Sequence, residues 1–152
     1  MVEHQFVVFS LSQEEFGLAI NLVREIIQPQ KIMKLPQSSE LIEGIVCLRG
    51  LIIPIVDLKK RFYGVITENL ATTRIIIVDL GGWMVGIMVD GVSEVLRFNE
   101  KEVTSLPPFV QRVSAACGLY AIGKLGDRLV LLLDLTQVFS GEEKNLLQKA
   151  VN

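Results

Sequence analysis

The chain has 152 residues, a length that fits one domain or two small subdomains sharing a single core. Half of its residues are hydrophobic, yet the longest apolar runs fall far short of the roughly 20 residues of a membrane span and are interpreted as buried strands. The net charge of −2 and the lack of a large basic cluster argue against a nucleic-acid footprint, and the run 59–61 (Lys-Lys-Arg) is interpreted as a solvated surface.

The first strands of the chain belong to an internal duplication. The segment FVVFSLSQEEFGLAINLVREII (6–27) aligns without a gap with IIIVDLGGWMVGIMVDGVSEVL (75–96), an offset of 69 residues. Leu11, Gly17, Val23 and Glu25 recur as identical residues, and nearly every apolar position is matched by another.

The repeat unit reads mostly as strand. Its β-branched and aromatic runs predict strands over residues 6–9, 16–20, 75–78 and 84–89. Residues 23–28 are expected to form a strand by the same repeat, although their apolar spacing also fits a helix face. Farther along, the residues from Pro36 to Glu40 indicate a turn into a short helix that ends at Gly44.

A second pair of matching segments follows. LIIPIVDLKKRFYG (51–64) aligns with RLVLLLDLTQVFSG (128–141), an offset of 77 residues. Asp57 and Asp134 each follow a predicted buried strand, so we interpret them as helix N-caps rather than as an acid–base pair.

The second half carries three further signals. Asp90-Gly91 predicts a hairpin turn into a new strand over 92–98. About eight extra residues lie between 97 and 119, where Pro107-Pro108 predicts an ordered, extended loop. Ser140 to Glu143 forms a capping box before a C-terminal helix, expected over 142–152.

These elements predict a mainly β protein. About five short strands per half, with glycine-rich turns, indicate two small closed or nearly closed β-barrels related by duplication. Because a half of this size buries little surface alone, the barrels are expected to pack together. We expect one domain over 1–152, with approximate halves 1–68 and 69–141 and an exchange of strands between them left open.

The duplication separates residues that the fold demands from residues that it does not. Leu48-Arg49-Gly50 aligns with Leu125-Gly126-Asp127, so a turn at this place does not need an arginine. Pro54 aligns with Leu131, which indicates a free strand edge or bulge in the first half only. Arg49 is therefore a candidate partner contact, with an intramolecular salt bridge to Glu25 or Glu43 as the alternative.

The sequence offers few residues for catalysis. His4 is the only histidine and lies near the N-terminus, where a nucleophile pair is not expected. Cys47 and Cys117 lie far apart without CxxC spacing, so we interpret them as small core residues of a protein from the reducing cytoplasm. No phosphate-binding or nucleophile-elbow motif is present. A binding module without enzymatic activity, cofactor or metal is expected.

The assembled pattern resembles the CheW family of bacterial chemotaxis adaptor (coupling) proteins. The family usually shows Asn-Leu-Arg-Gly where this chain has Cys-Leu-Arg-Gly at 47–50, and the matching residues run in order over about 5–148. The segments that carry the resemblance are FVVFSLSQEEFGLAINLVREI (6–26), KLP (34–36), GIVCLRGLIIPIVDLKKRF (44–62), GIMVDGVSEVL (86–96), LPP (106–108) and DRLVLLLDL (127–135).

The resemblance implies two packed, SH3-like five-stranded barrels and a non-catalytic role. CheW-like proteins couple the cytoplasmic tips of chemoreceptors (methyl-accepting proteins) to the histidine kinase CheA, through its regulatory domain, in signalling arrays. This implies a cytoplasmic protein that is recruited to membrane receptor arrays, without membrane insertion or nucleic-acid binding. Further CheW-like subunits in rings are additional expected partners.

The resemblance also implies site residues. Those expected to bind the receptor, in a groove between the subdomains, are Val23, Glu25, Ile26, Leu48, Arg49 and Gly50. Those expected to contact the kinase are Gly44, Pro54 and Phe109, the last in the inserted segment of the second half. A core role for Val23 stays open, because Val92 matches it in the repeat.

Two alternatives remain at this point. One is a CheW-like scaffold of a non-motility chemosensory pathway, which the cysteine at position 47 in place of the family's asparagine leaves open. A small-barrel module that binds a ligand or nucleic acid is disfavoured by the acidic charge balance and the aromatic content of 7%.

Overall fold

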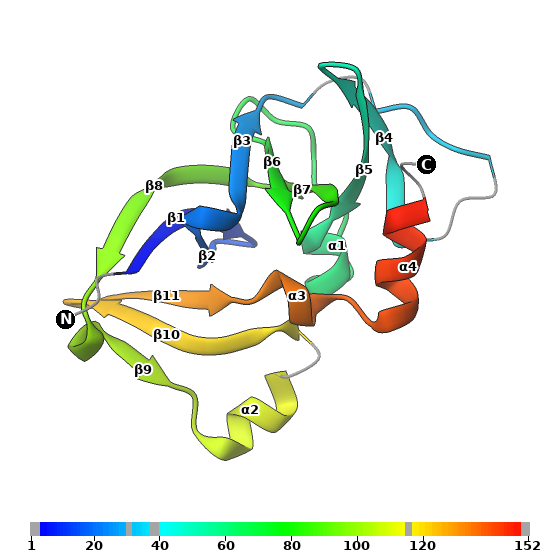
Figure 1. Ribbon diagram of the computed structural model, residues 1–152. Coiled ribbons are helices and arrows are strands. Elements are labelled where there is room, and N and C mark those ends of the chain that lie inside the picture. Colours follow the sequence, from blue (N-terminus) through cyan, green and yellow to red (C-terminus); the bar gives the residue numbers. More distant parts are fainter. Residues whose placement is uncertain (1–3, 30–31, 37–39, 115–116, 150–152) are drawn as a thin grey trace.

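The computed structural model describes residues 4–29, 32–36, 40–114 and 117–149. In this part of the chain, strands form a six-stranded sheet of order β8-β1-β2-β11-β10-β9 and a five-stranded sheet of order β3-β6-β7-β5-β4. Figure 1 shows the five-stranded sheet above the six-stranded sheet, with the last helix, α4, beside β4. The mainly β fold predicted from the sequence is confirmed.

The elements have the following bounds. The strands are β1 (His4–Leu11), β2 (Glu14–Ala19), β3 (Val23–Ile27), β4 (Ile42–Leu48), β5 (Leu51–Asp57), β6 (Arg74–Asp79), β7 (Met84–Val89), β8 (Gly91–Phe98), β9 (Val103–Ser105), β10 (Leu119–Leu125) and β11 (Arg128–Leu133). The helices are α1 (Leu58–Tyr63), α2 (Pro108–Ser114), α3 (Leu135–Val138) and α4 (Gly141–Lys149), with 3₁₀ turns η1 (Ile20–Leu22) and η2 (Glu100–Glu102). The open choice at residues 23–28 is thereby settled as a strand.

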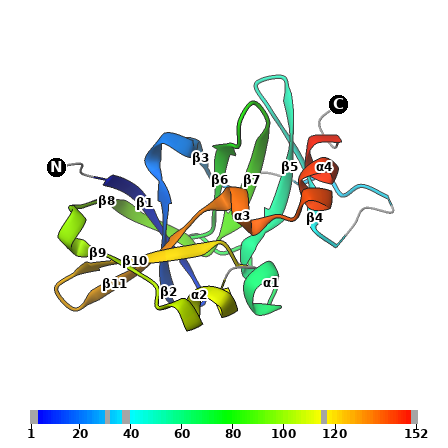
Figure 2. The same ribbon diagram turned by 60° about the horizontal axis from the view of Figure 1, so that its bottom comes forward.

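The two sheets do not follow the two sequence halves. β1 and β2, from the first half, join β8 to β11 of the second half in the six-stranded sheet, whereas β6 and β7 join β3 to β5 in the five-stranded sheet. Figure 2, turned from the first view, shows the same crossing of the chain between the sheets. Each sheet is therefore built from both copies of the repeat.

The identical glycines of the repeat lie where parallel strands approach each other. Gly86 on β7 lies opposite Ile55 on β5, and Gly17 on β2 lies opposite Leu132 on β11. A Cβ atom at Gly86 would lie 2.4 Å from the Cδ1 atom of Ile55, and one at Gly17 would lie 3.1 Å from the Cδ2 atom of Leu132. A side chain at either position would force neighbouring buried side chains to shift, which favours glycine in both halves.

The largest core lies between the sheets. Phe9 and Phe16 from the six-stranded sheet, stacked at 5.7 Å between ring centroids, pack in one cluster with Val56 and Ile87 from the five-stranded sheet. Each sheet also has a smaller cluster of buried side chains. The cluster of the six-stranded sheet surrounds Phe98, and that of the five-stranded sheet consists of isoleucine and valine side chains. Apolar burial is the main attraction between the two sheets.

The hairpin predicted at Asp90-Gly91 is wrong. β7 ends in the five-stranded sheet and β8 begins in the six-stranded sheet, where it pairs with β1. The backbone N–H of Asp90 donates to the Ser10 carbonyl at 3.0 Å, and its carboxylate accepts from the Ser12 N–H at 2.8 Å. The Asp-Gly pair thus serves a crossing between sheets, a use that local turn chemistry does not distinguish from a hairpin.

Two other local predictions are also wrong. Residues 40–41 form a turn and β4 begins at Ile42, so no helix ends at Gly44, which lies inside this strand; residues 37–39 of the predicted segment lie outside the described residues. The segment around Pro107-Pro108 is not an extended loop but contains η2, β9 and α2, with Pro108 at the first helical position. Proline fits there because the first N–H groups of a helix have no intrahelical acceptor.

The predicted caps are confirmed. The Asp57 carboxylate accepts from the Lys60 N–H at the start of α1, and the Asp134 carboxylate accepts from the Thr136 N–H at the start of α3. Ser140 and Glu143 form the capping box of α4 through bonds of 2.9 and 3.1 Å. Leu147 of this helix is fully buried in the main core, while residues 150–152 lie outside the described residues.

Within the described residues, no helix combines the length and the apolar character required to cross a membrane.

Candidate functional site

The candidate site begins where two parallel strands of the five-stranded sheet separate. β5 and β7 pair only from Ile55 onward, so residues 51–54 of β5 have no β7 partner. Pro54 lies at this boundary, opposite Ile45 of β4. Its counterpart Leu131 does pair, with Phe16 of β2. Proline has no N–H to donate, and the parallel ladder of the first half begins one residue later than that of the second half.

Side chains around this separation form two adjoining pockets. One, of about 570 Å³, is lined by Gly50, Leu51, Ile52, Ile53, Gly81, Gly82, Trp83, Met84 and Gln148. The other, of about 270 Å³, is lined by Arg24, Glu25, Leu48, Arg49, Leu51, Ile53, Ile77 and Met84. They share Leu51, Ile53 and Met84, and we call the combined feature the β5–β7 groove.

Arg49 lies at the rim of the groove in an unfavourable backbone conformation. Leu48 and Leu51 pair across a two-residue hairpin turn in which Arg49 has a φ of 51° and Gly50 a φ of 80°. Such turns require positive φ at both central residues, and a residue with a Cβ atom is strained there by about 1 kcal/mol or more. The aligned position in the second half is Gly126, with a φ of 60°. The turn thus accepts glycine, and arginine occupies it at a cost to stability.

The guanidinium of Arg49 is held across the groove by β3. Its Nη1 atom donates to the Oε2 atom of Glu25 at 2.6 Å, while 78% of the arginine side chain stays exposed. The alternative of an intramolecular salt bridge is therefore realised with Glu25; Glu43 pairs with Lys60 instead, at 3.0 Å. The ion pair orients Arg49 without removing it from the surface.

A second ion pair borders the groove. Arg24 donates to Asp79 at 2.7 Å, and the other carboxylate oxygen of Asp79 accepts from the N–H groups of Gly81 and Gly82. The hydrogen bond from Arg24, followed by that from Gly82, holds the pKa of Asp79 below its usual range. The groove therefore has apolar walls and a rim of paired charges.

The other predicted residues lie in three settings. Val23 is half-buried and packs against the main core, whereas Ile26 is 41% exposed on the edge strand β3. Gly44 and Pro54 are buried, and a Cβ atom at Gly44 would lie 2.4 Å from the Met33 carbonyl oxygen. Phe109, 70% exposed on α2, lies away from the groove on the six-stranded sheet (Figure 1). The structure thus brings the turn residues and Glu25 together and leaves Phe109 as a separate surface.

Sequence reasoning missed the walls of the groove. Leu51 and Met84 are 33 positions apart (84 − 51), and only the fold brings them to one pocket. A signal was present in the repeat, because Leu51 aligns with Arg128 and Met84 aligns with Glu15. Those two charged residues pair at 2.8 and 2.7 Å in the six-stranded sheet, which marks the place as one where the halves differ.

The residues considered for chemistry do not gather. His4 and Cys47 are exposed, and Cys117 is half-buried, so the interpretation of Cys47 as a core residue is wrong. Its place near the end of β4 turns its side chain away from the core, on the face opposite to buried Val46. Among the described residues, no group of three His, Cys, Asp or Glu side chains is placed to hold a metal ion.

Comparison with known proteins gives a consistent result. The family model described as "CheW-like domain" matches residues 5–143. A chemotaxis protein CheW from Klebsiella aerogenes is 33% identical over 145 residues, which cover 95% of this chain and 87% of that protein. A chemotaxis protein CheW from Treponema pallidum is 31% identical over 158 residues, covering 99% of this chain and 88% of that protein. The crystal structure of the scaffolding protein TtCheW from Thermoanaerobacter tengcongensis is similar with a TM-score of 0.77 at 35% identity, covering 92% of this chain and 90% of that one.

Proposed function

The chain belongs to the CheW family of chemotaxis scaffolding proteins, and on this premise we propose that it couples the cytoplasmic tip of a chemoreceptor to a CheA-type histidine kinase. The observation that carries the proposal is Arg49, an arginine in a left-handed turn position that the second half of the chain fills with glycine. Backbone strain that the fold does not require is typical of a functional position.

The β5–β7 groove suits the tip of a helical partner. Its walls offer Leu48, Leu51 and Met84 to apolar side chains, and its rim offers the Glu25–Arg49 ion pair. Interfaces of this kind combine an apolar centre with a polar border, and the border charges set register more than affinity. We therefore assign the receptor to Val23, Glu25, Ile26, Leu48, Arg49 and Gly50.

The kinase contact is assigned to the adjoining part of the same groove, on its β4–β5 side. The exposed end of the β4–β5 hairpin, with Leu51 and Ile52, presents apolar side chains beside the strand edge that Pro54 leaves unpaired by β7. Exposed apolar side chains next to a strand edge favour association with another protein. We assign this end, positioned by Gly44 and Pro54, to the regulatory domain of the kinase, and Phe109 to a contact that closes rings of kinase and CheW-like subunits.

In this proposal the protein acts by binding alone. It is non-catalytic, it works in the cytoplasm, and it joins receptor arrays at the membrane through its partners. No bond is made or broken, so its effect on the kinase depends on how it holds two proteins relative to each other.

The test is a charge reversal at the strained turn. Arg49→Glu places two carboxylates together at the rim, so we expect the affinity for the receptor tip to fall about tenfold, or about 1.4 kcal/mol. Binding of the purified protein to receptor-tip fragments and to the kinase regulatory domain is measured by calorimetry.

Two variants control the result. Glu25→Arg/Arg49→Glu restores an ion pair with exchanged charges, and Lys124→Glu makes the same charge change at an exposed position of β10. Unchanged affinities in Arg49→Glu would show that the site is misassigned. Failure of the wild-type protein to bind either partner would refute the coupling role itself.

A further inference from the structure

Three consecutive positively charged residues on α1 each contact a different part of the chain. Lys59 pairs with Asp90 at 3.3 Å and Lys60 pairs with Glu43 at 3.0 Å. Arg61 donates to the Val138 carbonyl at 2.8 Å and to a carboxylate oxygen of Glu143 at 2.7 Å. The run lies at the surface, with Arg61 exposed and Lys59 and Lys60 partly exposed, but each side chain also has a partner within the protein.

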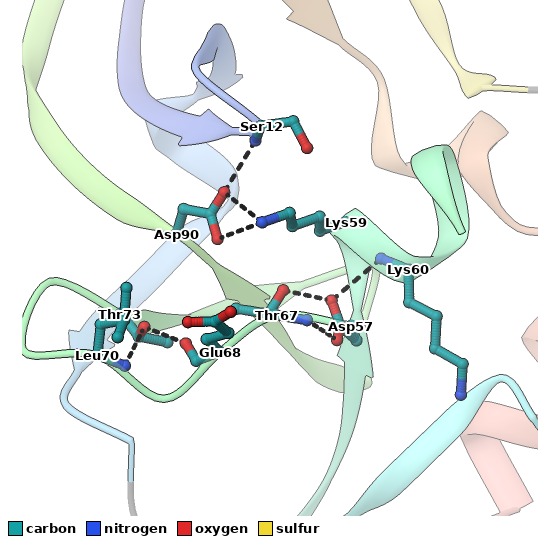
Figure 3. A network of polar contacts seen from close by, with 9 residues as sticks. All are labelled: Ser12, Asp57, Lys59, Lys60, Thr67, Glu68, Leu70, Thr73 and Asp90. Atoms are coloured by element: carbon teal, nitrogen blue, oxygen red, sulfur yellow. Dashed lines mark hydrogen bonds and ion pairs between the residues drawn. The ribbon is translucent and has the colours of Figure 1, made fainter. Parts of the chain in front are cut away.

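Lys59 links α1 to the crossing between the sheets. Figure 3 shows its ammonium group directed at the carboxylate of Asp90, which also accepts from the N–H of Ser12. Asp90 lies between β7 of the five-stranded sheet and β8 of the six-stranded sheet, and Ser12 lies in the turn between β1 and β2. One cation thus connects α1 to the six-stranded sheet through two contacts in series.

Arg61 links α1 to the segment that follows the six-stranded sheet. Its guanidinium lies 6.0 Å from the Phe139 ring centroid and holds the carboxylate of Glu143 in α4. Burial alone would raise the pKa of Glu143, but the hydrogen bond from Arg61 and those around Ser140 outweigh it and keep the pKa below its ordinary value. This contact therefore joins α1 to both α3 and α4.

The helix that carries these cations is itself fixed to the five-stranded sheet. Asp57, only 2% exposed at the end of β5, accepts from the Lys60 N–H at 3.2 Å. It also accepts from the N–H and the hydroxyl of buried Thr67, at 2.8 and 2.6 Å (Figure 3). Buried polar groups that are fully hydrogen-bonded hold one geometry. α1 therefore moves with β5, the strand that lines the β5–β7 groove.

We propose that Lys59 and Arg61 are positioning residues that clasp the two sheets at a fixed orientation. The sheets meet through apolar side chains, whose attraction is non-directional, so directed ion pairs are suited to fix the angle between them. This inference rests on the proposed function. The clasp sets the angle at which the groove on the five-stranded sheet and Phe109 on α2, beside the six-stranded sheet, face their partners. It acts on how receptor- and kinase-bound subunits join into rings through Phe109, because the receptor and kinase contacts proposed above both lie on the five-stranded sheet.

The duplication supports this separate role. The short helix α3 occupies the equivalent place in the second half, with Thr136, Gln137 and Val138 aligned to the three cations. A helix at this position therefore does not need positive charge. Lys60 provides an internal control. Its partner Glu43 lies on β4, in the five-stranded sheet to which α1 is fixed through β5, so this ion pair does not link the two sheets.

The first test measures the orientation of the sheets without any partner. Spin labels are placed at the exposed Cys47 on β4 and at Lys124→Cys on β10, with Cys117→Ser, and their separation is measured by double electron–electron resonance. We expect Lys59→Met/Arg61→Met to broaden or shift the distance distribution. Lys60→Met should leave it unchanged, and Lys59→Met alone serves if the double variant does not fold. A distribution identical to that of the wild type would overturn the proposal.

The second test separates coupling from binding. We expect Lys59→Met/Arg61→Met to retain wild-type affinity for each partner alone while receptor-dependent kinase activation falls about fivefold, with rescue by Lys59→Arg/Arg61→Lys. Equal losses in the binary affinities would show a merely structural role and overturn the proposal. If the wild type binds neither partner, the proposed function fails, whereas the spin-label result still decides whether the clasp exists.

Discussion

In both halves an arginine at or beside the hairpin turn pairs with the matching glutamate of the repeat, but the two arginines hold different positions and differ in exposure. In the first half Glu25 on β3 holds Arg49 at a single contact, and most of the guanidinium stays exposed. In the second half the matching Glu94 on β8 accepts from Arg128 at 3.0 Å, and Arg128 also forms a two-bond contact with Glu15. One arginine is presented to solvent, and the other is tied into the fold.

The difference decides which half has an open groove. Where the second half places Arg128 against Glu15, the first half places Leu51 and Met84, which line a pocket instead of closing it. The duplicated fold therefore contains one sealed and one open version of the same separation between parallel strands. The open groove differs from its sealed counterpart in two side chains, Leu51 and Met84 in place of Arg128 and Glu15, and not by an added element.

The largest effect is expected from transferring the seal. Leu51→Arg/Met84→Glu would rebuild the Arg128–Glu15 contact between β5 and β7 and replace the apolar walls of the groove. We expect partner affinity to fall about 100-fold, or about 2.8 kcal/mol, with the fold retained. Calorimetric titration with receptor-tip and kinase fragments measures the loss, and circular dichroism checks the fold.

The matched control keeps the groove apolar. Leu51→Met/Met84→Leu exchanges side chains of similar volume and should bind as the wild type does. Equal binding by the sealed variant and this control would mean that partners do not enter the groove.

A smaller effect, now on stability, should distinguish the two arginines. Arg128→Met removes contacts to two carboxylates and should lower the free energy of unfolding by about 1–2 kcal/mol, because partly buried charged hydrogen bonds are lost. Arg49→Met removes one exposed ion pair and should change it by less than about 0.5 kcal/mol. Urea unfolding measures both, and the reverse order would contradict the division into structural and functional arginines.

The smallest effect is a pH dependence of the sealed half. The hydrogen bond from Arg128 lowers the pKa of Glu15 from its ordinary value of 4.5. A carboxylate with a lowered pKa in the folded state stabilises the fold above its ordinary pKa, and this contribution is lost as the pH falls through the folded pKa. The stability difference between wild type and Arg128→Met should therefore shrink from pH 4.5 downward. Urea unfolding at about pH 6.5 and about pH 3.5 measures it, and a constant difference would refute the assignment.

The repeat predicted much of this structure from sequence. Alignment at 69 residues placed the strands and decided the ambiguous segment 23–28 as β3. Asp57 and Asp134, recurring after each buried strand, were identified as caps because a repeated fold element needs its cap twice. Arg49 was singled out because its aligned partner is Gly126. The strand and cap predictions rest on local chemistry compared between two copies, whereas the role of Arg49 in binding stays a prediction.

The failures concern partners distant in sequence. Asp90-Gly91 has the composition of a hairpin, and only the packing of two sheets makes it a crossing. The walls of the groove come from β5 and β7, which meet through a parallel pairing that no local pattern encodes. The partners of Lys59 and Arg61 were not predicted because they lie far away in the sequence: Asp90 is 31 residues from Lys59, and the Val138 carbonyl is 77 residues from Arg61.

The interleaving of the two halves has a consequence for synthesis. β1 and β2 are synthesised before the other strands, yet their sheet is completed only by β8 to β11, which follow β3 to β7 in the chain. The apolar faces of β1 and β2 therefore stay exposed to solvent while the following strands are synthesised. Pairings between strands so far apart in the sequence form slowly. A chain shortened after β7 would contain every strand of the five-stranded sheet but only β1 and β2 of the six-stranded sheet, so the main core between the sheets would lack the side chains of β11, α3 and α4.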